Sequence, residues 1–134
     1  MFTILVCGSR TWGNYDEVFS KLNSACDKHG LWEGGYKHNE VNRAKCKIIA
    51  ADTTTVDHWA SSWSDAYDAS FQRFELDAKD GISAASCRNA AMFAENPDLV
   101  LCFGKDSNTE ELINRAYRAN VAVQQFKQKP SIDF

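Results

Sequence analysis

Short apolar runs rich in β-branched residues alternate with amphipathic segments along almost the whole chain, and this alternation limits the fold more than any other feature. Strand-type runs are predicted at 2–7, 46–51, 71–76, 98–103 and 121–126. Helices are predicted between them, at about 15–29, 56–69, 82–95 and 107–119. Strands that alternate with helices pair in parallel through right-handed crossovers. We therefore expect an α/β fold with a doubly wound, mostly parallel sheet flanked by helices.

The length of the chain, 134 residues, suits one such sheet. We predict a single Rossmann-like domain over 1–134. Segment 31–45 is polar and too long for a simple connection between a helix and a strand, so we interpret it as an extended loop insertion. A lid, a small hairpin, an oligomer contact and a solvated surface loop are all open interpretations of it. Trp32 and Tyr36 are expected to be exposed there.

The composition argues against several classes of protein. Lys and Arg total 15 against 18 Asp and Glu, a net charge of −3, so the basic face that nucleic-acid binding requires is not indicated. No signal peptide and no apolar run of about 18 residues is present, so we expect no membrane partner. The cysteines are scattered without a CxxC pair: Cys7, Cys26, Cys46, Cys87 and Cys102. We interpret them as buried apolar residues of a cytoplasmic protein and expect no metal and no cofactor.

Doubly wound sheets bind ligands at the carboxyl ends of their strands, so the loops at that end carry the candidate residues. In the first loop Gly8 permits a tight turn, and the amides of Ser9 and Arg10 can face an anion. The guanidinium of Arg10 suits a bidentate grip on phosphate or carboxylate. An ordinary surface arginine after a simple turn is the alternative.

The second loop carries three consecutive threonines that run into a helix. The hydroxyls and amides of Thr53, Thr54 and Thr55 can hold a phosphate or a ribose at the helix N-terminus. Asp57, or Asp52, would accept hydrogen bonds from ribose hydroxyls. The alternative is a plain helix cap.

The third and fourth loops add a second arginine and another helix start. Arg88 stands among small residues, followed by Asn89, and a charge in such surroundings needs a partner, either a bound anion or a carboxylate of the protein. Gly104 precedes the last predicted helix, and Asn108 and Thr109 stand in its first turn; all three are candidate ligand-binding residues. An ordinary capped helix is the alternative there.

Together the loops resemble a known superfamily. "GSRTW" at 8–12, "RNAAM" at 88–92 and "FGKDSNTEELI" at 103–113 are similar to the SLOG superfamily, and within it to the YspA-like branch. Its relatives include DprA and the LOG phosphoribohydrolases, and the match covers nearly the whole chain except 31–45. The resemblance implies a Rossmann-like domain that binds nucleotides or nucleotide-derived signals. It also implies a homodimer or a higher homo-oligomer.

The chain departs from the pattern of these relatives at the residues that matter most for catalysis. A glycine-rich "GGxxGAD" stretch is replaced by "ADTTTVD", which keeps only Asp57, and a "GGxGT" turn is replaced by "KDSNT", which keeps Thr109. The catalytic glutamate of LOG enzymes corresponds to Leu112, whereas the arginine that they use corresponds to Arg88. The arginine is kept while the acid is lost, which indicates binding without hydrolysis.

We therefore expect a protein that senses or sequesters a nucleotide-derived small molecule, such as an ADP-ribose-type or cyclic nucleotide signal, without a catalytic residue of its own. The first alternative is an N-glycosidic hydrolase or phosphoribohydrolase. Its carboxylate would be Glu110, Glu111 or Asp57. The second alternative is a DprA-like, nucleic-acid-associated protein, which the acidic balance disfavours.

Overall fold

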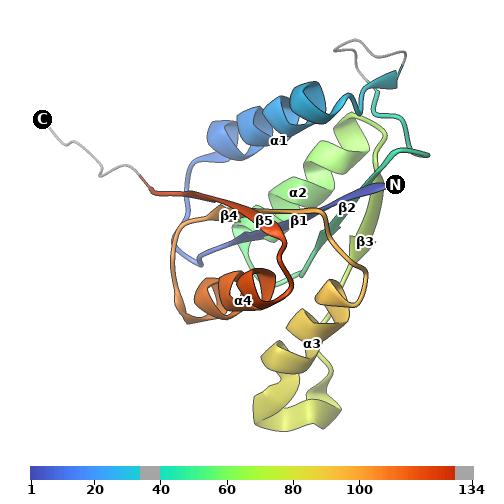
Figure 1. Cartoon of the computed structure of the whole chain (residues 1–134). Coiled ribbons are helices and arrows are strands. Elements are labelled where there is room, and N and C mark those ends of the chain that lie inside the picture. Colours follow the sequence, from blue (N-terminus) through green and yellow to red (C-terminus); the bar gives the residue numbers. More distant parts are fainter. Residues whose placement is uncertain (34–39, 129–134) are drawn as a thin grey trace, which may run out of the picture.

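The computed structural model describes residues 1–33 and 40–128, and its centre is a five-stranded, entirely parallel sheet (Figure 1). The strands lie in the order β3-β2-β1-β4-β5. Their bounds are β1 (Phe2–Gly8), β2 (Cys46–Ala50), β3 (Ser70–Arg73), β4 (Leu99–Phe103) and β5 (Ala122–Phe126). The predicted α/β fold is confirmed.

Helices cover both faces of the sheet. Their bounds are α1 (Tyr15–His29), α2 (Thr55–Ala66), α3 (Ala84–Phe93) and α4 (Ser107–Arg118), with a short 3-10 helix, η2 (Ala78–Ser83), before α3. Helices α1 and α2 lie on one face and α3 and α4 on the other (Figure 1). The chain winds from β1 outward to β3 and then returns to β4 on the other side of β1, so the strand order reverses between β1 and β4.

Strand β1 shows how the sequence builds two cores from one sheet. Side chains alternate across a strand, so Ile4 and Val6 pack under α1 and α2, whereas Leu5 and Cys7 pack under α3 and α4. All four are at most 4% exposed. Burying an aliphatic side chain of this size stabilises a fold by about 1.5–3 kcal/mol. Both faces of the central strands therefore fix the sheet, and with it the loops at its carboxyl end.

Helix α1 begins and ends where its sequence predicts. The carboxamide of Asn14 accepts a hydrogen bond from the amide of Glu17 at 3.1 Å, which caps the first turn. Gly30 ends the helix in the left-handed region at φ 63°, a conformation that costs glycine little. The predicted bounds, 15–29, are those of the structure.

The prediction that Trp32 is exposed is wrong. Its side chain is 2% exposed, packs against Trp63 and Tyr67, and donates a hydrogen bond from Nε1 to Asp27 at 2.7 Å. A single antiparallel bridge pairs Trp32 with Val41. Trp32 is part of the core under α1 and α2. The polar residues around it in the sequence give no indication of this burial. Tyr36 lies outside the described residues.

The cysteines are buried with one exception. Cys7, Cys26, Cys46 and Cys102 are buried free thiols, but Cys87 on α3 is exposed, so the prediction of burial is wrong for it. Cys87 precedes Arg88 on a short helix, and only one side of that helix faces the sheet. Across the described ranges, no helix is long and apolar enough to cross a bilayer. Those ranges also hold no cluster of three or more potential metal ligands.

Candidate functional site

A cavity of about 260 Å³ opens at the carboxyl ends of the strands, next to the reversal of strand order between β1 and β4. Residues from four separate loops line it, as expected for a doubly wound sheet. The predicted site residues in its lining are Gly8, Arg10, Thr53, Thr54, Arg88 and Asn108. Leu76, Ala85, Asp106 and Ser107 complete the walls. We call it the arginine cavity.

Arg88 is the most unusual residue of the arginine cavity. It is 5% exposed, and its Nη1 donates a long hydrogen bond of 3.4 Å to Thr53 Oγ1, while its Nε has no hydrogen-bond partner within residues 1–33 and 40–128. No carboxylate among the described residues forms an ion pair with it within 4.0 Å. A buried charge without a hydrogen-bonded counterion is costly. The guanidinium at this wall is therefore under-satisfied and suited to an anion.

Arg10 reaches the same cavity from the turn between β1 and α1. Its backbone N–H donates to Asp106 Oδ2 at 3.3 Å, which ties this turn to the start of α4. The residue lines the cavity and is exposed, unlike the buried Arg88. The structure thus brings together two arginines that lie far apart in the chain, one in the turn after β1 and the other on α3.

The two glycines of the site serve close packing. A Cβ on Gly8 would collide with the side chain of Val56, so the absence of a side chain lets the first turn of α2 approach the end of β1. Gly104 has φ 93°, in the left-handed region, and a Cβ there would collide with Ser9 Oγ. Both glycines therefore set how closely the loops of the site approach one another.

The N-terminus of α2 is closed by a reciprocal capping box. Thr54 Oγ1 accepts a hydrogen bond from the Asp57 amide at 3.2 Å, and Asp57 Oδ2 accepts from the amides of Thr53 and Thr54 at 3.1 and 3.0 Å. Burial raises the pKa of Asp57, although these amides and the charge of Arg88 act in the opposite direction. Asp57 is thus bound to its own helix, and Thr55 is exposed outside the lining.

The N-terminus of α4 has the same arrangement with the two residue types exchanged. Asp106 Oδ1 accepts from the Thr109 amide at 2.9 Å, and Thr109 Oγ1 accepts from the Asp106 amide at 2.7 Å. Thr109 is fully buried and does not line the cavity, and its hydroxyl holds Asp106 in place. Asp106 lines the cavity, and it was not among the predicted site residues. The spacing "DSNT" before an amphipathic helix was the signal for this cap.

Asn89 holds α3 to α4 behind the arginine cavity. It is fully buried, and its Nδ2 donates to Asn108 Oδ1 at 2.9 Å and to Glu111 Oε2 at 2.7 Å. Glu111 also accepts from Arg115 and Ser86. Burial opposes ionisation of Glu111, but the bonds from Arg115 and Asn89 outweigh it and lower the pKa of this carboxyl. Asn89 therefore positions Asn108, and Glu111 is a structural anion.

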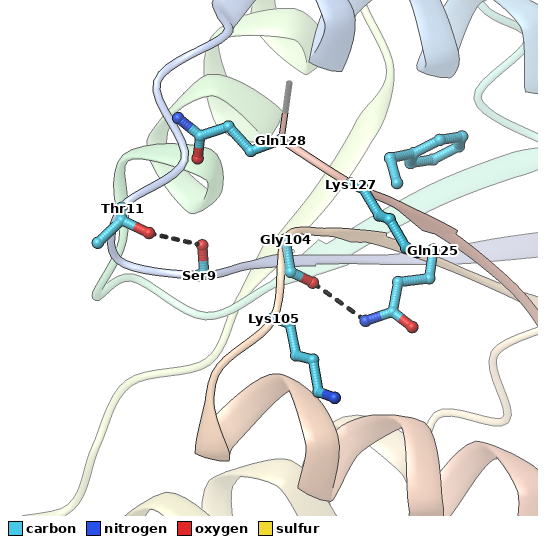
Figure 2. Close-up of a pocket in the computed structure, with 8 residues that line it drawn as sticks. Ser9, Thr11, Gly104, Lys105, Gln125, Lys127 and Gln128 are labelled. Atoms are coloured by element: carbon cyan, nitrogen blue, oxygen red, sulfur yellow. Dashed lines mark hydrogen bonds between the residues drawn. The ribbon is translucent and has the colours of Figure 1, made fainter. Parts of the chain in front are cut away.

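A second cavity, of about 440 Å³, lies beside the end of β5 (Figure 2). Its lining is Ser9, Thr11, Gly104, Lys105, Gln125, Phe126, Lys127 and Gln128. We call it the lysine cavity. The predicted residues Ser9 and Gly104 line this cavity and not the first. The prediction treated β5 as a closing strand and missed its polar end, although two adjacent glutamines in a short strand were a visible signal.

Comparisons with known proteins add little to this picture. No protein-family model matches the chain, and no curated protein matches it. One solved structure that it resembles is the C-terminal domain (residues 78–226) of the PF1911 hydrogenase from Pyrococcus furiosus. The two share 13% identity over 92% of this chain and 90% of that one, with a TM-score of 0.46.

Proposed function

We propose that this protein binds a nucleotide-derived small molecule through a phosphoryl group held in the arginine cavity, and that it senses or sequesters this ligand without turning it over. The observation that carries the proposal is the buried Arg88 guanidinium, which lacks a carboxylate partner among the described residues. A phosphate would supply the missing acceptors in the bidentate geometry that guanidinium favours.

The N-terminus of α2 adds to the attraction for an anion. Thr54, the N-cap of this helix, lines the cavity. The positive end of a helix dipole favours negative charge. The Thr54 hydroxyl already accepts from the Asp57 amide, so its own hydrogen is free to donate to a ligand.

The size of the arginine cavity limits what it encloses. Sites that enclose whole small molecules measure about 300–1,000 Å³. A volume of about 260 Å³ lies just below that range. It suits a phosphoryl group with part of the attached sugar, so the rest of a nucleotide would extend beyond the mouth.

The hydrogen bonding of the carboxylates supports binding rather than hydrolysis. A glycosidic hydrolase needs a carboxylate that can reach the reacting centre. Asp57 caps α2, Glu111 joins α3 to α4, and Glu110 forms an exposed ion pair with Lys105 at 3.2 Å. None of these three carboxylates lines the arginine cavity. We therefore favour a SLOG-like binding role over hydrolysis. The free thiols suit a cytoplasmic location. The resemblance to the SLOG superfamily also leads us to expect a homo-oligomer.

The test is a binding comparison with a matched control. AMP and ADP-ribose are titrated against the wild type, Arg88→Met and Arg118→Met, with calorimetry for affinity and chromatography for product. A charged hydrogen bond contributes about 1.5–3 kcal/mol, so we expect Arg88→Met to weaken binding about 10- to 100-fold. Arg118→Met, an exposed arginine at the far end of α4, should not change it.

Arg10→Ala provides a second variant whose fold is not in question, because the side chain is exposed. We expect it to weaken binding about tenfold or less. Absence of binding to the wild type, or equal affinities for the wild type and both cavity variants, would reject the proposal. Release of free base would favour the hydrolase.

A further inference from the structure

The lysine cavity lies directly across the backbone from the arginine cavity. At the end of β1 and in the turn that follows it, Gly8 and Arg10 line the arginine cavity. Ser9 and Thr11, which alternate with them, line the lysine cavity (Figure 2). The turn after β4 divides in the same way, with Lys105 on one side and Asp106 on the other. Neighbouring residues of the same two turns therefore line different cavities, which places the two cavities next to each other.

The lysine cavity is cationic in an acidic protein. Lys105 and Lys127 line it, and none of the described residues in its lining carries a carboxylate, although the chain as a whole carries a net charge of −3. A third lysine, Lys21, lies close by, with Nζ 5.0 Å from the centre of the Phe126 ring. Lys105 forms an ion pair with Glu110, and their side chains are 70% and 53% exposed. Because water weakens such an ion pair, Glu110 competes only weakly with a bound anion for Lys105. An anion is the ligand chemistry that this set of groups fits.

Gln125 and Ser9 add polar groups to the lining, beside the ring of Phe126. Gln125 Nε2 donates to the Gly104 carbonyl at 3.1 Å, which fixes its amide at the wall (Figure 2). Ser9 is only 4% exposed, and the left-handed backbone of Gly104 makes room for it. Its hydroxyl lies 3.4 Å from Thr11 Oγ1, a long contact that leaves donor capacity for a ligand.

We infer that the lysine cavity binds a second phosphoryl group of the same ligand, so that the ligand is a nucleotide with two phosphoryl groups joined through a ribose. The class includes nucleoside bisphosphates and dinucleotides that are joined by a phosphodiester link. Two phosphoryl groups that share a bridging oxygen are too close together to lie on opposite sides of a polypeptide backbone. This inference rests on the proposed function, because it places the first phosphoryl group beside Arg88.

The experiment compares AMP with adenosine 3′,5′-bisphosphate on the full chain by calorimetry. The variants are the double substitution Lys105→Gln with Lys127→Gln, and Lys28→Gln as a control of the same chemistry on the exposed last turn of α1. We expect the bisphosphate to bind the wild type about tenfold more tightly than AMP, as one additional charged contact provides. The double variant should lose this advantage and keep its affinity for AMP, and Lys28→Gln should keep both.

The outcomes separate this inference from the proposed function. If AMP binds in an Arg88-dependent way but the bisphosphate binds no better, the second phosphoryl site is rejected and the first stands. Persistence of the advantage in the double variant also rejects the inference. If neither nucleotide binds the wild type, both proposals fail together.

Discussion

The N-termini of α2 and α4 face the same cavity and are closed by the same two residue types in opposite order. In α2 the threonine is the N-cap and the aspartate, Asp57, stands three residues later. In α4 the aspartate, Asp106, is the N-cap and the threonine follows. Both boxes satisfy the helix ends equally. They differ in which side chain faces the cavity.

This exchange gives the two walls opposite electrostatic character. At α2 the hydroxyl of Thr54 lines the cavity, and the carboxylate of Asp57 is withdrawn to 4% exposure. At α4 the carboxylate of Asp106 lines the cavity and repels a phosphate. Arg88 bonds to Thr53, on the α2 side. An anion is therefore expected to sit against α2 and Arg88, with the α4 wall limiting how far it extends.

The turns that lead into these helices differ as well, and replacement of Gly104 gives the largest expected effect. The turn before α4 needs this glycine, because φ is 93° and a Cβ would collide with Ser9 Oγ, whereas the turn before α2 contains no glycine. Backbone strain and overpacking each cost about 1–3 kcal/mol. We expect Gly104→Ala to lower the free energy of unfolding by about 3 kcal/mol in urea titrations.

Gly13→Ala is the matched control for this substitution. A Cβ at Gly13 would meet nothing closer than 4.0 Å, and its φ is not positive. Its free energy of unfolding should stay within about 0.5 kcal/mol of the wild type. Equal losses in the two variants would show that the α4 turn is not under the constraint that distinguishes it from the α2 turn.

The next largest effect is expected at the N-cap of α2, where Thr54 is compared with the adjacent Thr55. Thr54→Ala removes the N-cap, which should lower the free energy of unfolding by about 1 kcal/mol. It also removes a hydroxyl from the cavity wall, and a lost neutral hydrogen bond should weaken AMP binding about threefold. Thr55→Ala, one residue later and exposed outside the lining, should leave affinity unchanged. Identical affinities for the two variants would contradict the assignment of the anion to the α2 wall.

The sequence predicts the sheet better than it predicts the cavity walls. Central strands such as β1 are covered by helices on both faces and are therefore apolar along their whole length. A short segment of sequence is enough to recognise this pattern. The sequence leaves the role of Asp57 open, because the same carboxylate can accept from a ribose hydroxyl or from the amides of Thr53 and Thr54. Trp32 shows a different limit, since its burial depends on contacts with Trp63 and Tyr67 more than thirty residues away in sequence.

The convergence of Arg10 and Arg88 was predictable for a simpler reason. Parallel strands place all their carboxyl ends at one edge of the sheet, so residues in the loops that follow them share that edge whatever their separation in sequence. The division of this edge into two cavities was not predictable. It depends on the alternation of side chains along the single turn that contains Ser9 and Arg10, and a turn has no fixed period to extrapolate.

The smallest expected effect tests the withdrawn carboxylate of α2. Asp57 accepts both amides through one oxygen, Oδ2, so the carbonyl of Asp57→Asn can keep both bonds. The substitution removes a negative charge that interacts with Arg88 and that weakens the attraction of the cavity for an anion. We therefore expect it to strengthen AMP binding about threefold. Asp65→Asn, an exposed carboxylate further along α2, is the control and should not change affinity.

The same variant has a pH signature with a definite sign. Burial raises the folded-state pKa of Asp57 above its ordinary value of 3.8, so the folded protein holds this proton more tightly than the unfolded chain. The protonated Asp57 therefore stabilises the folded state of the wild type fully below pH 3.8. This contribution to the free energy of unfolding is lost as the pH rises through the folded-state pKa. The free energy of unfolding of Asp57→Asn minus that of the wild type should increase over this interval. A difference that stays flat or decreases with pH would mean that Asp57 is not the buried, withdrawn carboxylate that distinguishes α2 from α4.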